Sequence, residues 1–535
     1  MALPQELQSV SEGETQKKIE KPSDAITDRE SKELIIAFAG PIGSGAKIVR
    51  EQVEQVLQTA GYIVHVIKVS EYLKEVLERS IAKNNSGTQV HSSGMERYKQ
   101  MQNTGNDLRK VQTDILAEYA IKTIAEIRTS DIPEDVDIDS YNPPRTAYLI
   151  DQLKHPDEVS LLRTVYGNLF FQFGVLSSSS RRQARLGEEG ITPQDASYLM
   201  ERDKREVDGF GQQLDKALKL ADFFIRNDHA NADGLQKQLL RFVGLIHGAN
   251  GISPSKEEYG MYIAYAAGLR SACLSRVVGA AIMDPNGSII STGRNDVPKF
   301  GGGLYGPEDG ENDARCVKLE GRMCYNNSHK NNLEAAIKGL ITKEVEDFNQ
   351  QSTTEEKIPK EFSSKISEKI QDETGVGNLI EFSRSIHAEM DAIISLARLG
   401  GGSTQDAILF TYTFPCHNCA RHIVSAGISK VYYLEPYEKS LAKVLHWDSI
   451  NTDGSDDSSQ KEHVQFLHFE GVAPRQYSNI FNADKERKRE DGIAIIDSVN
   501  VSNKKIPEYL DNYKIYEAKV TEHYESILHE IELGK

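Results

Sequence analysis

The chain has 535 residues, of which 39% are hydrophobic and 27% are charged, a composition typical of a soluble protein with sizeable cores. Single hydrophobic cores stop growing at roughly 250 to 300 residues, so this length favours two domains. The formal net charge of −17 argues against a protein whose main task is to grip a nucleic-acid backbone.

The length of the apolar runs and the number of cysteines indicate the cellular compartment. No apolar run approaches the roughly 18 residues that span a bilayer, and residues 1–32 lack the apolar core of a signal peptide. Five cysteines are few and odd in number, which disfavours a disulfide framework and fits a reducing compartment. We therefore expect a cytoplasmic protein without a membrane partner.

The first ordered elements predict a parallel sheet. Residues 1–32 are rich in Glu, Lys, Ser and Gln, which is typical of a flexible arm. Residues 34–39 (LIIAFA) form a continuous apolar run of the buried-strand type, and valines recur at helical spacing from Val49 to Val56. The run YIVHVIKV at residues 62–69 predicts a second strand. Strand, helix and strand in this order indicate a βαβ unit.

From there to Gly248 the patterns favour mainly helices. Two examples are KALKLADFFIRND at residues 216–228 and GLQKQLLRFVGLI at residues 234–246. Gly, Asn, Ser and Pro then cluster in HGANGISPSK at residues 247–256. Such a cluster between helix-like patterns indicates a linker, so we place the domain boundary there.

A glycine-rich turn joins the first strand to the first helix and is a candidate phosphate cradle. Its candidate nucleotide-binding residues are Gly40, Gly43, Ser44, Gly45 and Lys47. The P-loop pattern G-x-x-x-x-G-K-[ST] requires Lys at position 46 and a hydroxyl at position 47, whereas the chain has Ala46 and Lys47. We therefore expect nucleotide binding, with a nucleoside triphosphate and Mg²⁺ as the candidate ligands, and little or no kinase activity.

Further segments resemble P-loop nucleotide kinases. They are TGNDLR at 104–109, YLIDQLKHPDEVSLLRTVYG at 148–167, the pair Arg181 and Arg182, and ADFFIRNDHANADGLQKQL at 221–239. The resemblance implies a P-loop NTPase-like parallel-sheet domain at residues 33–248. Asp151 either supports a magnesium-linked water or is a strand-end residue. Arg181 and Arg182 could equally be charges on a helix surface.

The second half begins with a predicted helix at 257–275 and two β-type runs at 277–293 around an Asn286-Gly287 turn, which favours a tight hairpin. Residues from about 300 to 376 are interpreted as an insertion. The predicted order then resumes as helix, strand, helix and strand at 379–400, 407–414, 416–428 and 430–436. Residues 481–535 form a C-terminal helical extension.

The strongest chemical signal is H-A-E at residues 387–389, followed after one predicted strand by P-C-H-N-C at residues 415–419. A catalytic zinc site uses three nitrogen or thiolate ligands and leaves the fourth position for water, and His387, Cys416 and Cys419 meet that requirement. The two cysteines lie three residues apart at a helix start, so their sulfurs share one face and the helix N-terminus favours the thiolate.

Each half of this pattern has a simpler interpretation on its own. A lone C-x-x-C is usually a structural zinc knuckle or a redox pair, and a lone H-x-E is usually a helix surface. Together they form the signature of zinc deaminases, and a redox pair would leave His387 and Glu389 unexplained. We therefore predict zinc-dependent hydrolytic deamination of a cytosine base, with Glu389 as the catalytic proton shuttle outside the ligand set.

Residues 259–436 resemble the deoxycytidylate deaminases. The segments that carry the resemblance are GAAIMDPNGSIISTGRND (279–296), IHAEMDAI (386–393) and TFPCHNCARHIVSAGISKVYY (413–433). It implies a cytidine deaminase-like α/β/α three-layer domain at residues 256–480. It also implies that Asn295, at the family's T-G-Y-N-G asparagine, touches the nucleotide. The flanking Arg294 and Asp296 depart from that loop, and Asn295 could equally be a turn residue.

A second metal site is an alternative for Cys316, Cys324 and His329, which lie close together in the sequence. Their spacing is unusual and no fourth ligand is obvious, so incidental thiols in a loop are favoured slightly.

The pairing of the two halves, together with EPYEKSLA at 435–442, resembles the bacterial antiphage dCTP deaminases. That resemblance implies conversion of dCTP or dCMP to the uracil nucleotide, depletion of dCTP during infection, a homo-oligomer, and restraint by a small RNA or another inhibitor. Three alternatives stay open. In one, the first half is a sensor or interaction module that controls the deaminase. A polynucleotide cytidine or adenosine deaminase would need a basic, aromatic-lined channel. A bifunctional nucleotide kinase-deaminase would need a catalytically active P-loop.

Overall fold

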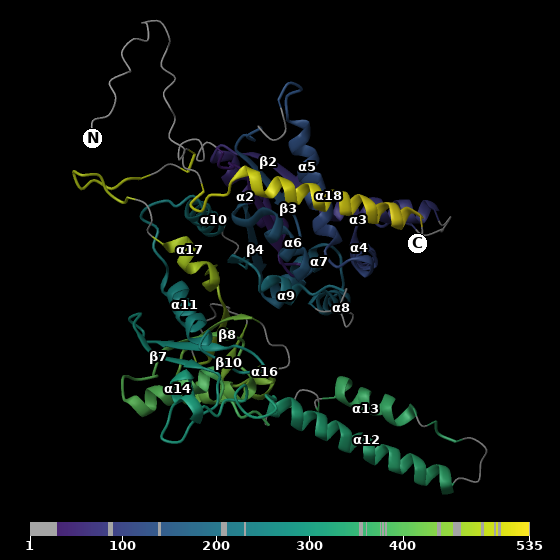
Figure 1. The fold of residues 1–535 in the computed structure, drawn as a ribbon, viewed down its shortest axis with the longest axis vertical. Helices are drawn as coiled ribbons and strands as arrows, with labels where there is room; N and C mark the ends of the chain where they lie inside the picture. The colour runs from purple at the N-terminus through teal and green to yellow at the C-terminus, as the bar shows by residue number, and fades with distance from the viewer. Residues whose placement is uncertain are drawn as a thin grey trace, which may run out of the picture.

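The computed structural model describes residues 29–83, 89–136, 141–204, 211–228, 232–351, 357–359, 361–374, 376, 379, 382–435, 440–452, 462–482, 486–496, 499–500 and 504–533. Within these ranges the strands form two six-stranded sheets, one in each half of the chain (Figure 1). No helix of the described ranges is both long and apolar enough to cross a bilayer.

The first sheet has the order β12-β5-β4-β1-β3-β2, in which β12 (Gly471–Val472) comes from the second half of the chain and the other five strands run parallel. Its strands are β1 (Leu34–Ala39), β2 (Ile63–Ile67), β3 (Thr146–Ile150), β4 (Phe170–Leu176) and β5 (Phe223–Arg226). β1, β3 and β4 are buried along their whole length, as expected for a parallel sheet covered on both faces. The parallel sheet predicted from the strand-helix-strand pattern is confirmed.

Helices cover both faces of this sheet. They are α2 (Ala46–Thr59), α3 (Val69–Lys83), α4 (Gly94–Val111), α5 (Ile115–Ser130), α6 (Pro156–Tyr166), α7 (Ser179–Glu188), α8 (Pro193–Lys204), α9 (Leu214–Leu218) and α10 (Ala232–Ile246). One apolar core includes Ile121 and Leu162, and the core on the other face includes Val53 and Phe242.

The predicted helix at residues 216–228 is wrong. The structure has the short helix α9 followed by strand β5, and β3 and β4 also lie in the stretch that we expected to be mainly helical. A short apolar run that is buried on both faces has no alternation, so periodicity cannot separate a buried strand from a buried helix. The helix predicted at 234–246 is confirmed by α10.

The second sheet has the order β10-β11-β9-β8-β6-β7. Its strands are β6 (Gly279–Met283), β7 (Ile289–Arg294), β8 (Ile408–Thr413), β9 (Lys430–Glu435), β10 (Ile450–Asn451) and β11 (Val464–His468). Ala280 and Ile282 face a core with α14 (Ala388–Leu399) and α15 (His417–Ser425), whereas Ala281 and Met283 face α11 (Lys256–Gly268). The arrangement is the predicted three-layer α/β/α.

Local details of the second half follow the sequence in part. The Asn286-Gly287 hairpin is confirmed by antiparallel pairing of β6 with β7 and by φ of 101° at Gly287. The expected insertion contains a pair of helices, α12 (Tyr325–Gln351) and α13 (Glu361–Glu373), that projects away from the sheet (Figure 1). The remaining elements are α16 (Ala442–Leu445), β12 (Gly471–Val472), α17 (Tyr477–Phe481) and α18 (Leu510–Leu533).

The end of the chain returns to the first half. β12 pairs antiparallel with β5, although we predicted residues 256–480 as one separate domain. Helix α18 contributes the buried residues Leu510 and Tyr524 to the core that contains α5 and α6 (Figure 1). A shared core that includes Phe224, Met261 and Phe469 lies between the two sheets.

Candidate metal centre

His387 and Cys416 each occupy the N-cap position of a helix beside the second sheet. His387 precedes α14, and Cys416 precedes α15. Gly293 in β7 brings α14 close to the sheet, because a Cβ at this position would lie 2.2 Å from the backbone oxygen of Ala388. A glycine is therefore required where the strand passes under the ligand-bearing helix.

The structure brings His387, Cys416 and Cys419 together. Their ligand atoms lie within 4.8 Å of one another, and the His387 Nδ1 is 3.4 Å from the Cys416 Sγ and 3.3 Å from the Cys419 Sγ. Bonds of about 2.0 to 2.3 Å in a tetrahedron separate zinc ligands by about 3.5 Å, so this donor set fits zinc in size and chemistry. The three side chains could hold the metal.

Hydrogen bonds within the cluster shift the pKa values of its members. Hydrogen bonds with the Cys419 thiol and with His387 together lower the pKa of Cys416 to about 4, although burial opposes them. The hydrogen bond with Cys416 in turn raises the pKa of His387 to about 9. The lowered pKa of Cys416 favours its thiolate, the form in which cysteine binds metal.

Glu389 lies in the first turn of α14, two residues after His387, and is 5% exposed. Burial raises the pKa of its carboxyl above the usual range. It lies outside the cluster of metal-binding atoms found in the described residues. The arrangement offers a buried proton acceptor beside a candidate metal position.

Asn295, predicted to touch the nucleotide, directly follows β7 and is buried. Its Oδ1 accepts a hydrogen bond from the Val278 amide at 2.8 Å, and its Nδ2 donates to the Arg276 carbonyl at 2.7 Å. These bonds anchor the backbone before β6. The next residue, Asp296, forms a β-bridge with Ile386, so the loop adjoins the residue that precedes His387.

Asp391 was missed by sequence reasoning. Its Oδ2 accepts a hydrogen bond from the Arg294 amide at 3.0 Å, and its backbone amide donates to the His387 carbonyl at 2.9 Å. Asp391 thereby links the end of β7 to the first turn of α14. The signal was present in H-A-E-M-D, where residues four apart share a helix face.

The second metal site considered for Cys316, Cys324 and His329 is not supported. In the described part of the chain, metal-binding atoms gather only at His387, Cys416 and Cys419. The Cys324 Sγ lies 3.2 Å from the Ser275 Oγ, and the His329 ring lies 5.5 Å from the Phe382 ring. The Cys324 and His329 side chains thus face different neighbours.

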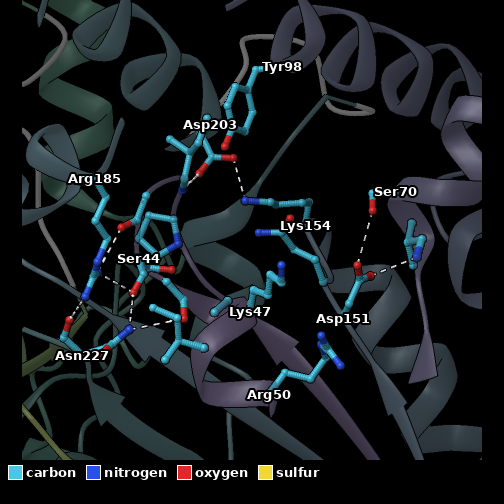
Figure 2. A pocket seen from close by; sticks show the side chains of 18 of the residues that line it. Ser44, Lys47, Arg50, Ser70, Tyr98, Asp151, Lys154, Arg185, Asp203 and Asn227 are labelled. Carbon is cyan, nitrogen blue, oxygen red and sulfur yellow. Dashed lines mark hydrogen bonds and ion pairs between the residues drawn. The ribbon is translucent and has the colours of Figure 1, made fainter. Parts of the chain in front are cut away.

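A cavity of about 1190 Å³ lies at the glycine-rich loop of the first half (Figure 2). Gly43, Ser44, Gly45 and Lys47 line it, and Gly40 begins the loop. Gly43 and Gly45 have φ of 78° and 75°, so the loop needs glycine at both positions. The backbone after β1 therefore adopts the predicted tight turn into α2.

Arginines and an asparagine hold the carbonyls of this loop. Arg182 Nε donates to the Ile42 carbonyl at 2.8 Å, and Arg185 Nη1 donates to the Ser44 carbonyl at 2.8 Å. Asn227 Nδ2 also donates to the Ser44 carbonyl at 3.0 Å. Arg182 is thus a residue that shapes the loop, whereas Arg181 lines the cavity.

Asp151 lines the same cavity after β3 (Figure 2). Its carboxylate accepts hydrogen bonds from the Val69 amide at 2.9 Å and the Ser70 hydroxyl at 3.5 Å. Burial raises the pKa of Asp151 to about 6. The position suits either of the roles predicted for it.

Comparisons with known proteins concern the second half. Residues 254–435 match the model of the cytidine and deoxycytidylate deaminase zinc-binding region. The deoxycytidylate deaminases of Enterobacteria phages T4 and T2 are 32% and 30% identical over 190 residues, which are 36% of this chain and 81% and 84% of theirs. A crystal structure of dCMP deaminase from the cyanophage S-TIM5 in complex with dCMP and dUMP is 20% identical, with a TM-score of 0.22 over 41% of this chain and 100% of that one.

Proposed function

The chain belongs to the cytidine and deoxycytidylate deaminase family and is a zinc-dependent deaminase, and from this premise we propose that its substrate is a free deoxycytidine nucleotide, dCMP or dCTP. The observation that carries the proposal is the convergence of His387, Cys416 and Cys419 beside the buried carboxyl of Glu389. The net charge of −17 supports a free nucleotide over a nucleic-acid strand.

In this proposal His387, Cys416 and Cys419 hold the zinc ion. When bound, zinc supplies a Lewis acid that makes a water molecule acidic near neutral pH. Glu389 accepts the proton of that water and delivers protons to the ring nitrogen of cytosine and to the departing amino group. Water oxygen replaces the amino group at C4, so the products are a uracil nucleotide and ammonia.

We assign the first half the binding of a nucleotide that governs the deaminase. Its cavity, the turn from β1 into α2 and the strand β12 shared between the halves support this role. The candidate ligand is a nucleoside triphosphate, with Mg²⁺ near Asp151. The absence of Lys at position 46 and of a hydroxyl at position 47 argues against phosphoryl transfer.

The biological role follows from the resemblance to antiphage dCTP deaminases alone. We propose that the activity depletes dCTP during phage infection, that the chain forms a homo-oligomer, and that a small RNA or another inhibitor restrains it. Expression of the wild-type chain and of Glu389→Gln in cells challenged with phage tests this role. Equal protection by both chains would contradict a role that depends on deamination.

The substrate is tested by incubating the purified chain with deoxycytidine, dCMP, dCTP, CTP and single-stranded DNA and measuring uracil formation. We expect turnover of dCMP or dCTP and at least tenfold slower turnover of the other three. Turnover of single-stranded DNA alone would establish the polynucleotide deaminase instead.

The regulatory role is tested with Gly43→Ala, since a Cβ at this position would lie 2.8 Å from the Arg182 carbonyl oxygen. We expect the response of deamination to added ATP to disappear. Gly187→Ala is the control, because nothing lies within 4 Å of a Cβ there. Robust phosphate transfer from ATP to a deoxynucleoside monophosphate, abolished by Lys47→Ala, would instead establish the bifunctional enzyme.

A further inference from the structure

Lys154 and Asp203 meet at the glycine-rich loop of the first half (Figure 2). Lys154 Nζ donates to the Gly40 carbonyl at 2.9 Å and to the Asp203 Oδ1 at 2.7 Å. The Asp203 Oδ2 accepts a hydrogen bond from the Ile42 amide at 2.6 Å. Asp203 is buried and Lys154 is largely covered, with 2% and 13% of their side-chain surfaces exposed. An ammonium and a backbone amide of the loop thus converge on one carboxylate.

The lysine within the loop is placed differently. The side chain of Lys47 is 79% exposed, and its Nζ lies 3.8 Å from the Glu51 Oε1. Position 46, where the P-loop pattern has its lysine, is an alanine. Lys154, which follows β3, is therefore the buried ammonium at this loop.

Other donors of the loop are still unused. No described residue accepts a hydrogen bond from the Gly43 or Gly45 amide, and both amides belong to residues that line the cavity. The Ser44 hydroxyl is buried, at 1% exposure, and has no hydrogen-bond partner among the described residues. Successive backbone amides around left-handed residues form a concave anion site. These donors suit a ligand with several acceptor oxygens.

We propose that Lys154 is the phosphate-binding ammonium of this cavity and that Asp203 is an internal stand-in for phosphate, which a polyphosphate ligand displaces. The proposal rests on the nucleotide site proposed above for the first half. A carboxylate has two oxygens and one negative charge, whereas a polyphosphate has more acceptor oxygens and more negative charge. A polyphosphate can therefore bind the unused amides and Lys154 at the same time. Two anions at the same donors repel each other, so the phosphate must expel Asp203.

The charge of Lys154 depends on its partner. Burial lowers the pKa of the Lys154 ammonium, and the adjacent Asp203 opposes that effect. A phosphate in place of Asp203 would keep the ammonium charged in the same way. The exchange therefore keeps an opposite charge beside the Lys154 ammonium, and it requires the expelled Asp203 carboxylate to reach solvent.

Binding to the full-length chain, measured by isothermal titration with inorganic tripolyphosphate, ATP and inorganic phosphate, tests the proposal. Lys154→Met should weaken binding of tripolyphosphate and ATP at least about tenfold, since it removes a charged hydrogen bond. Asp203→Asn should tighten binding severalfold because it removes the competing charge. Lys68→Met, which replaces an exposed lysine of the same cavity, should change affinity less than about threefold.

The double variant Lys154→Met/Asp203→Asn separates this role from a folding defect, because it leaves no buried charge unpaired. It should melt close to the wild type and bind at least about tenfold more weakly than Asp203→Asn, the variant that differs from it only at Lys154. ATP binding much more tightly than tripolyphosphate would indicate a nucleotide ligand, and equal affinities would indicate the polyphosphate alone.

Wild-type affinity in Lys154→Met, or weaker binding in Asp203→Asn, would overturn the proposal and leave the nucleotide site standing. A wild-type chain that binds none of the probes would overturn both, whether or not it deaminates dCMP.

Discussion

Arg475 Nη2 lies 2.7 Å from the Oδ1 of Asp222, and this ion pair joins the two halves of the chain. Asp222 is fully buried just before β5, and Arg475 follows β12, the strand that pairs with β5. The same carboxylate accepts a hydrogen bond from Arg163 at 3.0 Å and from the Gln172 amide at 2.8 Å. The buried carboxylate of Asp222 therefore binds donors from both halves of the chain.

Asp222→Asn should lower the free energy of unfolding by about 3 kcal/mol, because it removes the charge of a fully buried carboxylate that pairs with two half-buried guanidinium groups. Urea unfolding followed by circular dichroism measures this loss. Glu525→Gln, which removes the exposed partner of Lys122, is the control and should change stability by less than about 1 kcal/mol. Equal effects of the two substitutions would show that the junction does not depend on Asp222.

Gly293→Ala should push α14 away from β7, because the added Cβ would lie 2.2 Å from a backbone oxygen and 2.4 Å from the Ala392 backbone nitrogen. We expect a stability loss of about 1 to 3 kcal/mol, together with reduced zinc content, since His387 moves with the helix. Gly339→Ala in α12 is the matched control, because nothing lies within 4 Å of its Cβ, and it should stabilise slightly. Full zinc content in Gly293→Ala would show that this contact does not position the ligand.

His468 should make the junction sensitive to acid. Its ring lies 5.1 Å from that of Tyr433 and 5.9 Å from that of Phe224, and burial lowers its pKa from 6.5 to about 4. Above pH 6.5 the ring is neutral in the folded and unfolded chain, and between pH 6.5 and about 4 only the unfolded chain takes up the proton. Stability should therefore fall as pH drops through this window.

The contribution of His468 is measured by urea unfolding of the wild type and His468→Gln at pH 7.5 and 5. The variant should lose less stability than the wild type between these two values. His91→Gln, at an exposed position, should behave like the wild type. An unchanged pH dependence in His468→Gln would assign the acid sensitivity to other groups.

Cys416→Ser should lose zinc and deamination together and should melt at a lower temperature, because the free energy of metal binding is linked to folding. Zinc content by atomic absorption and a thermal melt check this. Cys316→Ser is the control, since its thiol lies outside the metal cluster of the described residues, and it should keep its zinc. Zinc retained in Cys416→Ser and lost in Cys316→Ser would reverse the assignment.

The sequence was sufficient to predict the metal cluster because its three ligands lie close together in the chain. A histidine before one helix and C-x-x-C at the start of the next need only one intervening strand to meet, and residues 407–414 showed that strand. The glycines of the loop after β1 likewise predicted its tight turn. In both cases the chemistry depends on residues close together in the chain.

The missed features depend on contacts between distant residues. Residues 223–226 form a strand because they pair with β4 and β12. Their short apolar run alone does not indicate this pairing. Lys154 and Asp203 are separated by 49 positions, so only the fold brings them to the glycine-rich loop. The sequence motif predicted a nucleotide contact for Asn295, but it could not predict the hydrogen bonds that its side chain makes with Val278 and Arg276 in the structure.

The most direct test of the account is to measure zinc content and dUMP formation from dCMP, alongside dUTP formation from dCTP, for the wild type and Glu389→Gln. The account predicts about one zinc ion per chain in both proteins, with deamination slower by about 10²- to 10⁴-fold in the variant, because the carboxylate moves protons and does not bind the metal. Loss of zinc along with activity, or deamination within tenfold of the wild type, would contradict the role assigned to Glu389.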